Sequence, residues 1–361
     1  MRGPISRSSP KNGPTRRPRP GSPTRPFAII GFFLAALFLF SAPASRSEAA
    51  PQLRISTENA AEHVQTRAVG KFTRLLRERL GVGFDVSHHF GAALFRDRDV
   101  VPALDAGQVE MAVPGTWQLD RFEPNMGLFL LPAFYGRGPD AYHALLDGPV
   151  GRALVARLES RLDVKVIGRW LDLGHANLYG VTRKISRHED IAGLRIRSPG
   201  GLANEARIKA LGGESVDIPW PDLPQALARG AVDGLLTTDA TLAGARLWEV
   251  GVRFAFEDHE YFPMYVPMMR GGFWRRLSEA QRTAVLESWE AVVDEARREA
   301  AADQKEAAVQ LTAHGIEVVR PDQGETDRWR EKILPAQDAI VKDMGMDADL
   351  VEQAMKELAS F

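Results

Sequence analysis

Arg197 stands near the end of a short alternation of apolar and basic residues, where its guanidinium could bind a carboxylate. Over residues 194–198 the apolar side chains alternate with Arg195 and Arg197, which predicts a short strand with both arginines on one face. Pro199 ends that strand. A guanidinium offers a planar fork of N–H donors that matches two carboxylate oxygens and stays charged at physiological pH. The segment therefore suits anion binding, while a solvated strand end with surface arginines is the alternative interpretation.

Trp220 lies between two prolines and follows a predicted strand over residues 215–219. The prolines restrict the backbone on both sides of this large aromatic side chain. Such a tryptophan could form the apolar wall of a concave ligand site, in which a few polar groups fix the ligand. A tryptophan buried in the core is the alternative interpretation of the same residues.

The remaining residues that could do chemistry lack the spacing of known catalytic or metal-binding motifs. The eight histidines contain no pair four residues apart and no His-Glu-x-x-His motif. A phosphate-binding P-loop, a dinucleotide-binding glycine fingerprint and a Gly-x-Ser-x-Gly elbow are also absent from the sequence. The chain has no cysteine, so disulfides, thiol nucleophiles and lipidated cysteine anchors are excluded. We therefore assign no catalytic residue, no metal ligand and no cofactor, and expect that the protein is not an enzyme.

The first 50 residues differ in composition from the rest of the chain. Basic residues precede an apolar run over residues 27–40 and small residues follow it, as in a secretory signal peptide over residues 1–50. A membrane-spanning helix needs about twenty apolar residues, and this run has about fourteen, although an uncleaved anchor is the alternative. We expect export to the periplasm. Without residues 1–50 the net charge is about −8, which argues against nucleic acid as a partner.

Strands and helices alternate along the mature chain. This order predicts mainly parallel sheets, whose ligand-binding loops follow the carboxyl ends of the strands. Residues 56–59 and 114–117 are two such loops. The first half of the chain predicts strands at 53–56, 84–88 and 109–113, and helices at 63–80 and 100–107. The second half repeats the pattern with strands at 164–168, 194–197, 215–219 and 231–236, and helices at 202–211 and 223–229.

A very long helix is predicted near the C-terminus. Ser278 and Gln281 form a capping box at its start, and Gly315 marks its end. About 36 helical residues would span about 54 Å, which exceeds one small domain, so this helix is expected to connect two lobes. Two helices broken near Asp303 are the alternative.

Taken together, these segments resemble the solute-binding proteins of tripartite ATP-independent periplasmic (TRAP) transporters, the DctP family. The resemblance covers nearly the whole mature chain and depends on the order and spacing of several stretches. These stretches are residues 91–107, 110–113, 131–134, 189–197, 211–213, 218–222 and 226–234.

The resemblance implies a two-lobed periplasmic-binding-protein-like α/β fold. Each lobe would be a mixed, mainly parallel sheet flanked by helices, and the long helix would span both lobes. Residues 51–174 and about 263–300 would form lobe I, and residues 175–262 and about 301–361 would form lobe II. The lobes would close over a small organic acid, which the protein would deliver to TRAP membrane permease subunits.

The resemblance also implies which residues bind the ligand. The arginine that binds the carboxylate ends a Gly-Leu-Lys-Ile-Arg segment in the family, and Arg197 holds that position here. The aromatic residue of the family's Pro-Phe-Ser-Glu segment corresponds to Trp220. We expect five further residues to supply polarity and shape at the rim of the site, namely Thr116, Trp117, Asn177, Thr237 and Tyr261.

Two departures from the family pattern bear on the ligand. The family commonly carries a second arginine where this chain has Ala176 or Asn177. Thr237 stands where an asparagine of the family often contacts the ligand. We therefore expect a ligand with one carboxylate or a larger apolar body. A periplasmic sensing protein that feeds a signalling partner is the alternative function, and a secreted enzyme on the same scaffold is a third.

Overall fold

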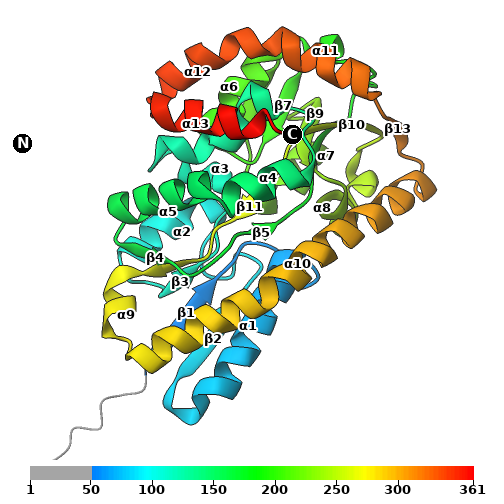
Figure 1. Cartoon of the computed structure of the whole chain (residues 1–361). Helices are drawn as coiled ribbons and strands as arrows, with labels where there is room; N and C mark the ends of the chain where they lie inside the picture. Colours follow the sequence, from blue (N-terminus) through cyan, green and yellow to red (C-terminus); the bar gives the residue numbers. More distant parts are fainter. Residues whose placement is uncertain (1–50) are drawn as a thin grey trace, which may run out of the picture. The chain divides into compact units, whose positions relative to one another are not determined.

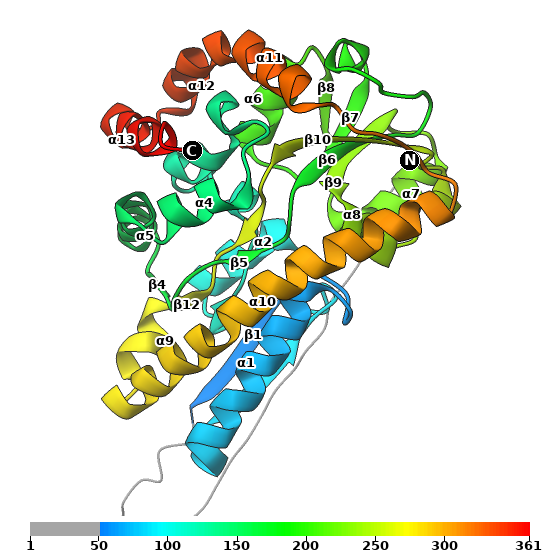
Figure 2. The same ribbon diagram turned by 45° about the vertical axis from the view of Figure 1, so that its right-hand side comes forward.

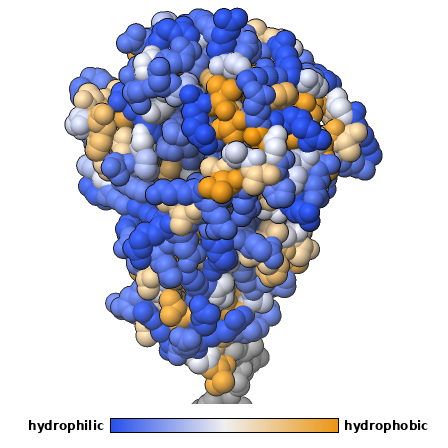
Figure 3. Space-filling view, turned by 90° about the vertical axis from the view of Figure 1, so that its right-hand side faces the viewer, coloured by the Kyte–Doolittle hydropathy of each residue, from blue (hydrophilic) through white to orange (hydrophobic). Residues whose placement is uncertain are grey.

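Two mixed β-sheets organise residues 51–361, the part of the chain that this computed structural model describes (Figure 1). The predicted signal peptide, residues 1–50, lies outside the described residues. Within residues 51–361 no helix has an apolar stretch long enough to cross a membrane. Hydrophilic side chains cover most of the face shown in Figure 3, where apolar residues form small separate patches.

The first sheet has the strand order β2-β1-β3-β12-β4. β1 pairs in parallel with β2 and β3, whereas β12 is antiparallel to both β3 and β4. In β1 the side chains of Leu53 and Ile55 are fully buried and alternate with more exposed residues, which is the pattern of a strand with one face on the core. The strands are β1 (Gln52–Ser56), β2 (Asp85–His89), β3 (Met111–Ala112), β4 (Val164–Val166) and β12 (Met268–Arg270).

The second sheet has the strand order β13-β10-β6-β9-β7-β8. β6 is antiparallel to both of its neighbours, and the other neighbouring strands pair in parallel. Each sheet therefore contains one reversed strand, which confirms the predicted mixed, mainly parallel sheets. The strands are β6 (Ala176–Gly180), β7 (Arg195–Ser198), β8 (Glu214–Asp217), β9 (Gly234–Thr238), β10 (Phe254–Tyr261) and β13 (Glu317–Val319).

A short two-stranded ribbon connects the two sheets. β5 (Leu171–Asp172) pairs antiparallel with β11 (Met264–Tyr265). The chain runs from β4 of the first sheet through β5 to β6 of the second sheet, and it returns from β10 through β11 to β12. The two reversed strands, β6 and β12, are the strands that the chain enters directly after this ribbon.

Helices flank both sheets, and the predicted strands and helices are present with ends within three residues of the predicted positions. The α-helices before the long helix are α1 (Val64–Leu80), α2 (Asp97–Asp105), α3 (Thr116–Leu119), α4 (Pro139–Leu146), α5 (Pro149–Arg161), α6 (Leu202–Ala210), α7 (Leu223–Ala228), α8 (Asp239–Gly244) and α9 (Gly271–Arg276). The 3-10 helices are η1 (Gly81–Gly83), η2 (Pro124–Leu130), η3 (Pro132–Phe134), η4 (His188–Ile191), η5 (Trp220–Asp222), η6 (Leu247–Val250) and η7 (Leu334–Ala336).

The long helix α10 (Glu279–Ala313) is continuous over 35 residues and passes Asp303 without a break. Ser278 and Gln281 form the predicted capping box at its start. α10 packs along α1 of lobe I, the first lobe, and then reaches α8 of lobe II, the second lobe (Figure 2). The structure therefore confirms the expectation that one helix spans both lobes.

Three helices follow α10 and β13, namely α11 (Gln323–Ile333), α12 (Gln337–Met344) and α13 (Ala348–Leu358). α12 packs against α6, whereas α13 packs against α4 and α5. Leu350 and Leu358 of α13 belong to the same apolar core as Leu145 and Leu154 of these two helices. The C-terminal segment therefore contacts helices that lie in both predicted lobes, and the lobe boundaries stay a prediction.

Candidate ligand-binding site

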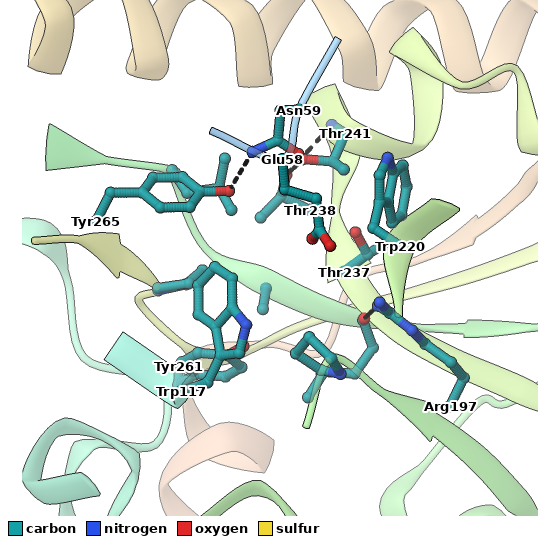
Figure 4. A pocket seen from close by; sticks show the side chains of 15 residues that line it. Glu58, Asn59, Trp117, Arg197, Trp220, Thr237, Thr238, Thr241, Tyr261 and Tyr265 are labelled. Atoms are coloured by element: carbon teal, nitrogen blue, oxygen red, sulfur yellow. Dashed lines mark hydrogen bonds between the residues drawn. The ribbon is translucent and has the colours of Figure 1, made fainter. Parts of the chain in front are cut away.

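A cavity lies where loops at the ends of strands from both sheets meet, and the space in it and at its open mouth is about 420 Å³ (Figure 4). Its walls come from the loop after β1, from α3, from the ends of β7 and β9, and from the segment between β10 and β11. The lining residues are Glu58, Asn59, Trp117, Leu173, Ala176, Arg197, Pro199, Trp220, Leu236, Thr237, Thr238, Thr241, Tyr261, Pro263 and Tyr265.

Arg197 on β7 holds its guanidinium at the wall of the cavity. The side chain is 2% exposed. Its Nε donates a hydrogen bond to the carbonyl of Ile218 at 2.9 Å, and its Nη1 donates to the carbonyl of Leu236 at 3.2 Å. These two bonds fix the plane of the guanidinium, and no hydrogen bond from Nη2 to residues 51–361 competes with a ligand.

The guanidinium of Arg197 stays charged in spite of its burial. Burial lowers its pKa to about 10, because the charged form loses hydration, and the nearby carboxyl of Glu58 acts in the opposite direction. A pKa of about 10 leaves the group protonated at neutral pH. The solvated strand end that the sequence left open is therefore not what the structure shows.

Trp220 covers the side of the cavity next to Arg197. It begins η5 directly after Pro219, and the guanidinium carbon of Arg197 lies 5.6 Å from the centre of its ring. A cation over an aromatic face is attracted by the negative potential of the ring. The indole ring therefore supports the position of the guanidinium and adds an apolar wall to the same cavity.

Trp117 on α3 reaches the cavity because two glycines leave room for it. A Cβ atom on Gly115 would lie 2.3 Å from the Trp117 ring, and one on Gly201 would lie 2.4 Å from the Trp117 carbonyl oxygen. Both distances are shorter than any side chain tolerates. The ring also packs edge-to-face against Tyr265, with centroids 5.4 Å apart.

Thr237 and Tyr261, two residues expected at the rim of the site, also line the cavity. Thr237 lies near the end of β9, next to Thr238, whose side chain accepts a hydrogen bond from the backbone N–H of Thr241 at 3.3 Å and caps α8. Tyr261 ends β10. Five of the seven predicted residues, Arg197, Trp220, Thr237, Trp117 and Tyr261, therefore meet in one cavity.

The structure places the other two predicted residues, Asn177 and Thr116, outside the cavity lining. Successive residues of a strand point to opposite faces of its sheet, and in β6 it is Ala176 that lines the cavity. Asn177 points to the other face, where its Oδ1 accepts a hydrogen bond from the backbone N–H of His259 at 3.0 Å. Thr116 is buried beside Trp117 on the short helix α3. Of the two residues that could correspond to the family's second arginine, Ala176 therefore lines the cavity and Asn177 does not.

Residues that sequence reasoning did not select also line the cavity, above all Glu58, Asn59 and Tyr265. The signal for the first two was their place in the predicted loop after the first strand. The side-chain nitrogen of Asn59 donates to the hydroxyl of Tyr265 at 2.8 Å and to the side chain of Gln65 at 2.8 Å. No local pattern could indicate Tyr265, because β11 has only two residues.

Glu58 projects its carboxylate into the cavity (Figure 4). Its Oε1 accepts a hydrogen bond from the backbone N–H of Asp97 at 3.0 Å. Burial raises the pKa of the Glu58 carboxyl, and the positive charge of Arg197 partly opposes this shift. Burial and the neighbouring Glu58 raise the pKa of Asp97 well above its usual range. The first lobe thus presents a carboxyl group to the cavity, opposite the guanidinium of the second lobe.

A second cavity adjoins the first, and the space in it and at its open mouth is about 580 Å³. The two share the lining residues Asn59, Leu173, Trp220 and Thr241. The second cavity is also lined by His63, whose pKa is lowered to about 3 by burial and by the charge of Arg67. This imidazole is therefore neutral at pH 7 and adds no positive charge to the site.

Comparison with known proteins places most of the chain in one family model. Residues 55–343 match the model of bacterial extracellular solute-binding proteins, family 7. The chain is 26% identical to the 2,3-diketo-L-gulonate-binding periplasmic protein of Escherichia coli, over 89% of this chain and 95% of that protein. It is 23% identical to the C4-dicarboxylate-binding periplasmic protein of Rhodobacter capsulatus, over 88% and 95% of the two chains.

A solved structure shows the same fold. It is that of a TRAP periplasmic solute-binding protein from Ochrobactrum anthropi, which is 25% identical to this chain. The similarity covers 86% of this chain and 95% of that chain, with a TM-score of 0.76.

Proposed function

Because the chain belongs to the bacterial extracellular solute-binding proteins of family 7, we propose that it is the receptor of a TRAP transporter and binds a small organic acid. The single observation that carries this proposal is the buried, charged guanidinium of Arg197 at the wall of a cavity between the two lobes. A buried cation without a carboxylate partner is costly, and a ligand carboxylate would supply that partner.

Closure of the lobes would complete the site. The cavity is lined by side chains from both lobes, with Glu58 and Trp117 on one side and Arg197 and Trp220 on the other. The ribbon of β5 and β11 and the helix α10 connect the lobes and would serve as the hinge. A ligand that contacts both walls would favour the closed form over the open form by its extra contacts there.

The partners and the location follow from the same proposal. The closed, liganded protein would dock onto the membrane permease subunits of the transporter and release its ligand to them. The relatives from Escherichia coli and Rhodobacter capsulatus are named periplasmic proteins, which supports a periplasmic location for this chain. No step of this function requires turnover of the ligand, so we propose a binding protein and not an enzyme.

The lining of the cavity supports a ligand with a single strongly bound carboxylate. Ala176 occupies the place at which a second arginine would face the cavity. Among the lining residues within 51–361, Arg197 is the one with a permanent positive charge. The relatives bind 2,3-diketo-L-gulonate and C4-dicarboxylates by name, so small organic acids are the class to test first.

The test compares Arg197→Gln with Arg195→Gln. Arg195 lies on the same strand but does not line the cavity. Its guanidinium forms an ion pair with Asp233, with a nitrogen–oxygen distance of 2.9 Å. A thermal-shift screen over mono- and dicarboxylates, keto acids, sugar acids and amino acids would identify a ligand, and calorimetry would measure its affinity. We expect Arg197→Gln to lose roughly 2–5 kcal/mol of binding free energy, because a buried charge loses its partner.

Arg195→Gln should bind the ligand as the wild type does. Wild-type affinity in Arg197→Gln would contradict the proposal. Conversion of the bound acid to a product would support a secreted enzyme instead.

A further inference from the structure

Glu58 is the second charged side chain of the cavity, and its sign is opposite to that of Arg197. It follows β1 of the first lobe, whereas Arg197 lies on β7 of the second. Figure 4 shows the carboxylate of Glu58 directed into the cavity from the side opposite to the guanidinium. A ligand between the lobes would therefore meet a positive group at one end and a negative group at the other.

The two charges are close enough to influence each other but are not hydrogen-bonded to each other. The hydrogen bond of Glu58 comes from the backbone of Asp97, and those of Arg197 go to two backbone carbonyls. Within residues 51–361 no hydrogen bond engages Oε2 of Glu58. Each side chain thus keeps part of its hydrogen-bonding capacity for a molecule in the cavity.

Aromatic rings surround the space between the two charges. Trp117, Trp220, Tyr261 and Tyr265 all line the cavity. The face of an aromatic ring attracts cations, and rings around a carboxylate form a site that suits an ammonium or another organic cation. The faces of the same rings carry negative potential and therefore do not attract a second carboxylate.

We propose that Glu58 determines specificity by binding a cationic group of the ligand, so that the protein captures a zwitterionic organic acid whose carboxylate binds Arg197. This inference rests on the proposed function of the same cavity. It deepens that function by naming the ligand class. Hydroxy acids and dicarboxylates, which carry no cationic group, are the competing classes, and the wild-type cavity should bind both more weakly.

The neighbouring side chains agree with this preference. A second carboxylate would face Glu58, and Ala176 leaves it without a cation. The adjoining cavity adds the imidazole of His63, which is neutral and supplies no cation to a second carboxylate. Arg96 and Arg98, whose positive charges also act on the Glu58 carboxyl, line neither cavity.

The experiment uses acids that differ at one end. For chain lengths of three to six carbons, the panel contains acids with a terminal ammonium, hydroxyl, methyl or carboxylate, such as 4-aminobutanoate, 4-hydroxybutanoate, butanoate and succinate. Calorimetry measures each against wild type, Glu58→Gln, Glu62→Gln and Arg197→Gln. The glutamine at position 58 keeps an oxygen that can accept the hydrogen bond from Asp97, so this variant should fold, and circular dichroism checks that it does.

We expect wild type to bind the ammonium acid of the best length most tightly. Glu58→Gln should lower the affinity for that ligand by at least about tenfold. The difference in affinity between this ligand and the hydroxyl and carboxylate acids should become smaller. Glu62→Gln removes a nearby negative charge that lies outside the first cavity, and it should leave the order of affinities unchanged.

The possible results separate the two proposals. The role of Glu58 is overturned if a dicarboxylate or hydroxy acid binds most tightly, or if the order of affinities in Glu58→Gln is the same as in wild type. In either case, loss of binding in Arg197→Gln would still support the organic-acid receptor. Binding that survives Arg197→Gln overturns the proposed function itself. If no acid of any length binds to wild type, both proposals fail.

Discussion

Arg96 and Asp222 form a two-pronged ion pair that joins the two lobes beside the cavity. Nη2 of Arg96 donates to Oδ1 of Asp222 at 2.9 Å, and Nη1 donates to the other carboxylate oxygen. Arg96 precedes α2 of the first lobe, and Asp222 ends η5, which begins with the cavity residue Trp220. The pair therefore connects a loop of the first lobe to the segment that carries a wall of the cavity.

We predict that this ion pair stabilises the closed form. Arg96→Gln should weaken ligand binding by about two- to fivefold at low ionic strength, because an exposed pair contributes little and salt screens it. The difference between wild type and variant should shrink as sodium chloride is raised. Calorimetric titrations at several salt concentrations would measure it.

Arg275→Gln is the control, because Arg275 forms a two-pronged but more exposed pair with Asp163 away from the cavity lining. The control should bind like wild type at every salt concentration. Equal weakening in both variants would contradict a specific role of the Arg96–Asp222 pair in closure.

A second prediction concerns the alanine that faces the cavity on β6. Ala176→Arg would add a cation to the lining, and we expect it to raise the affinity for succinate relative to butanoate by about tenfold. Calorimetry with both acids measures this ratio. An unchanged ratio would show that the position cannot supply the missing second arginine.

Asn177→Arg places the same side chain one residue further along the strand and serves as the comparison. Asn177 is 3% exposed and faces away from the cavity, so an arginine there would be buried without a partner. We expect a loss of about 3 kcal/mol or more in the free energy of unfolding, measured by urea denaturation, and no gain in succinate affinity.

A third prediction concerns the pH dependence of stability at His63. This half-buried histidine caps the start of α1, where its Nδ1 accepts a hydrogen bond from the backbone N–H of Gln65 at 3.2 Å. Burial and the charge of Arg67 lower its pKa in the folded protein to about 3, below the value of about 6.5 in the unfolded chain. The unfolded state therefore takes up the proton first as the pH falls.

Stability from His63 is accordingly present above pH 6.5 and is lost as the pH falls towards 3. Between pH 7 and pH 5, the free energy of unfolding should fall by up to about 2 kcal/mol more in wild type than in His63→Asn. This variant keeps a capping acceptor but does not titrate. Denaturant unfolding of both proteins across this range provides the test. Parallel stability curves would contradict the lowered pKa.

Several elements were predictable because short stretches of sequence specify them. Helix α10 begins at the capping box of Ser278 and Gln281 and ends before Gly315, whose φ of 80° suits a residue without a side chain. The alternation around Arg197 correctly placed this arginine near the end of a strand. In each case the signal lies within a few neighbouring residues.

Other features could not be predicted because their signals are too short or depend on distant partners. β5 and β11 have two residues each, too few for any alternation to show. Which of Ala176 and Asn177 faces the cavity depends on the register of β6, because a shift of one residue exchanges the two faces of a strand. Glu58 lay in a predicted rim loop, but its carboxylate is held by a hydrogen bond from the backbone N–H of Asp97, a residue 39 positions away in the chain.

Sequence alone was sufficient to identify the family, the alternating strands and helices, the long helix and the arginine that we expect to bind the ligand. These depend on local periodicity, on capping residues and on the order of motifs along the chain. The folded chain was needed to show that Glu58 faces the cavity of Arg197 and that Asn177 does not. Those outcomes depend on contacts between residues far apart in the chain, which the packing of the two lobes brings together.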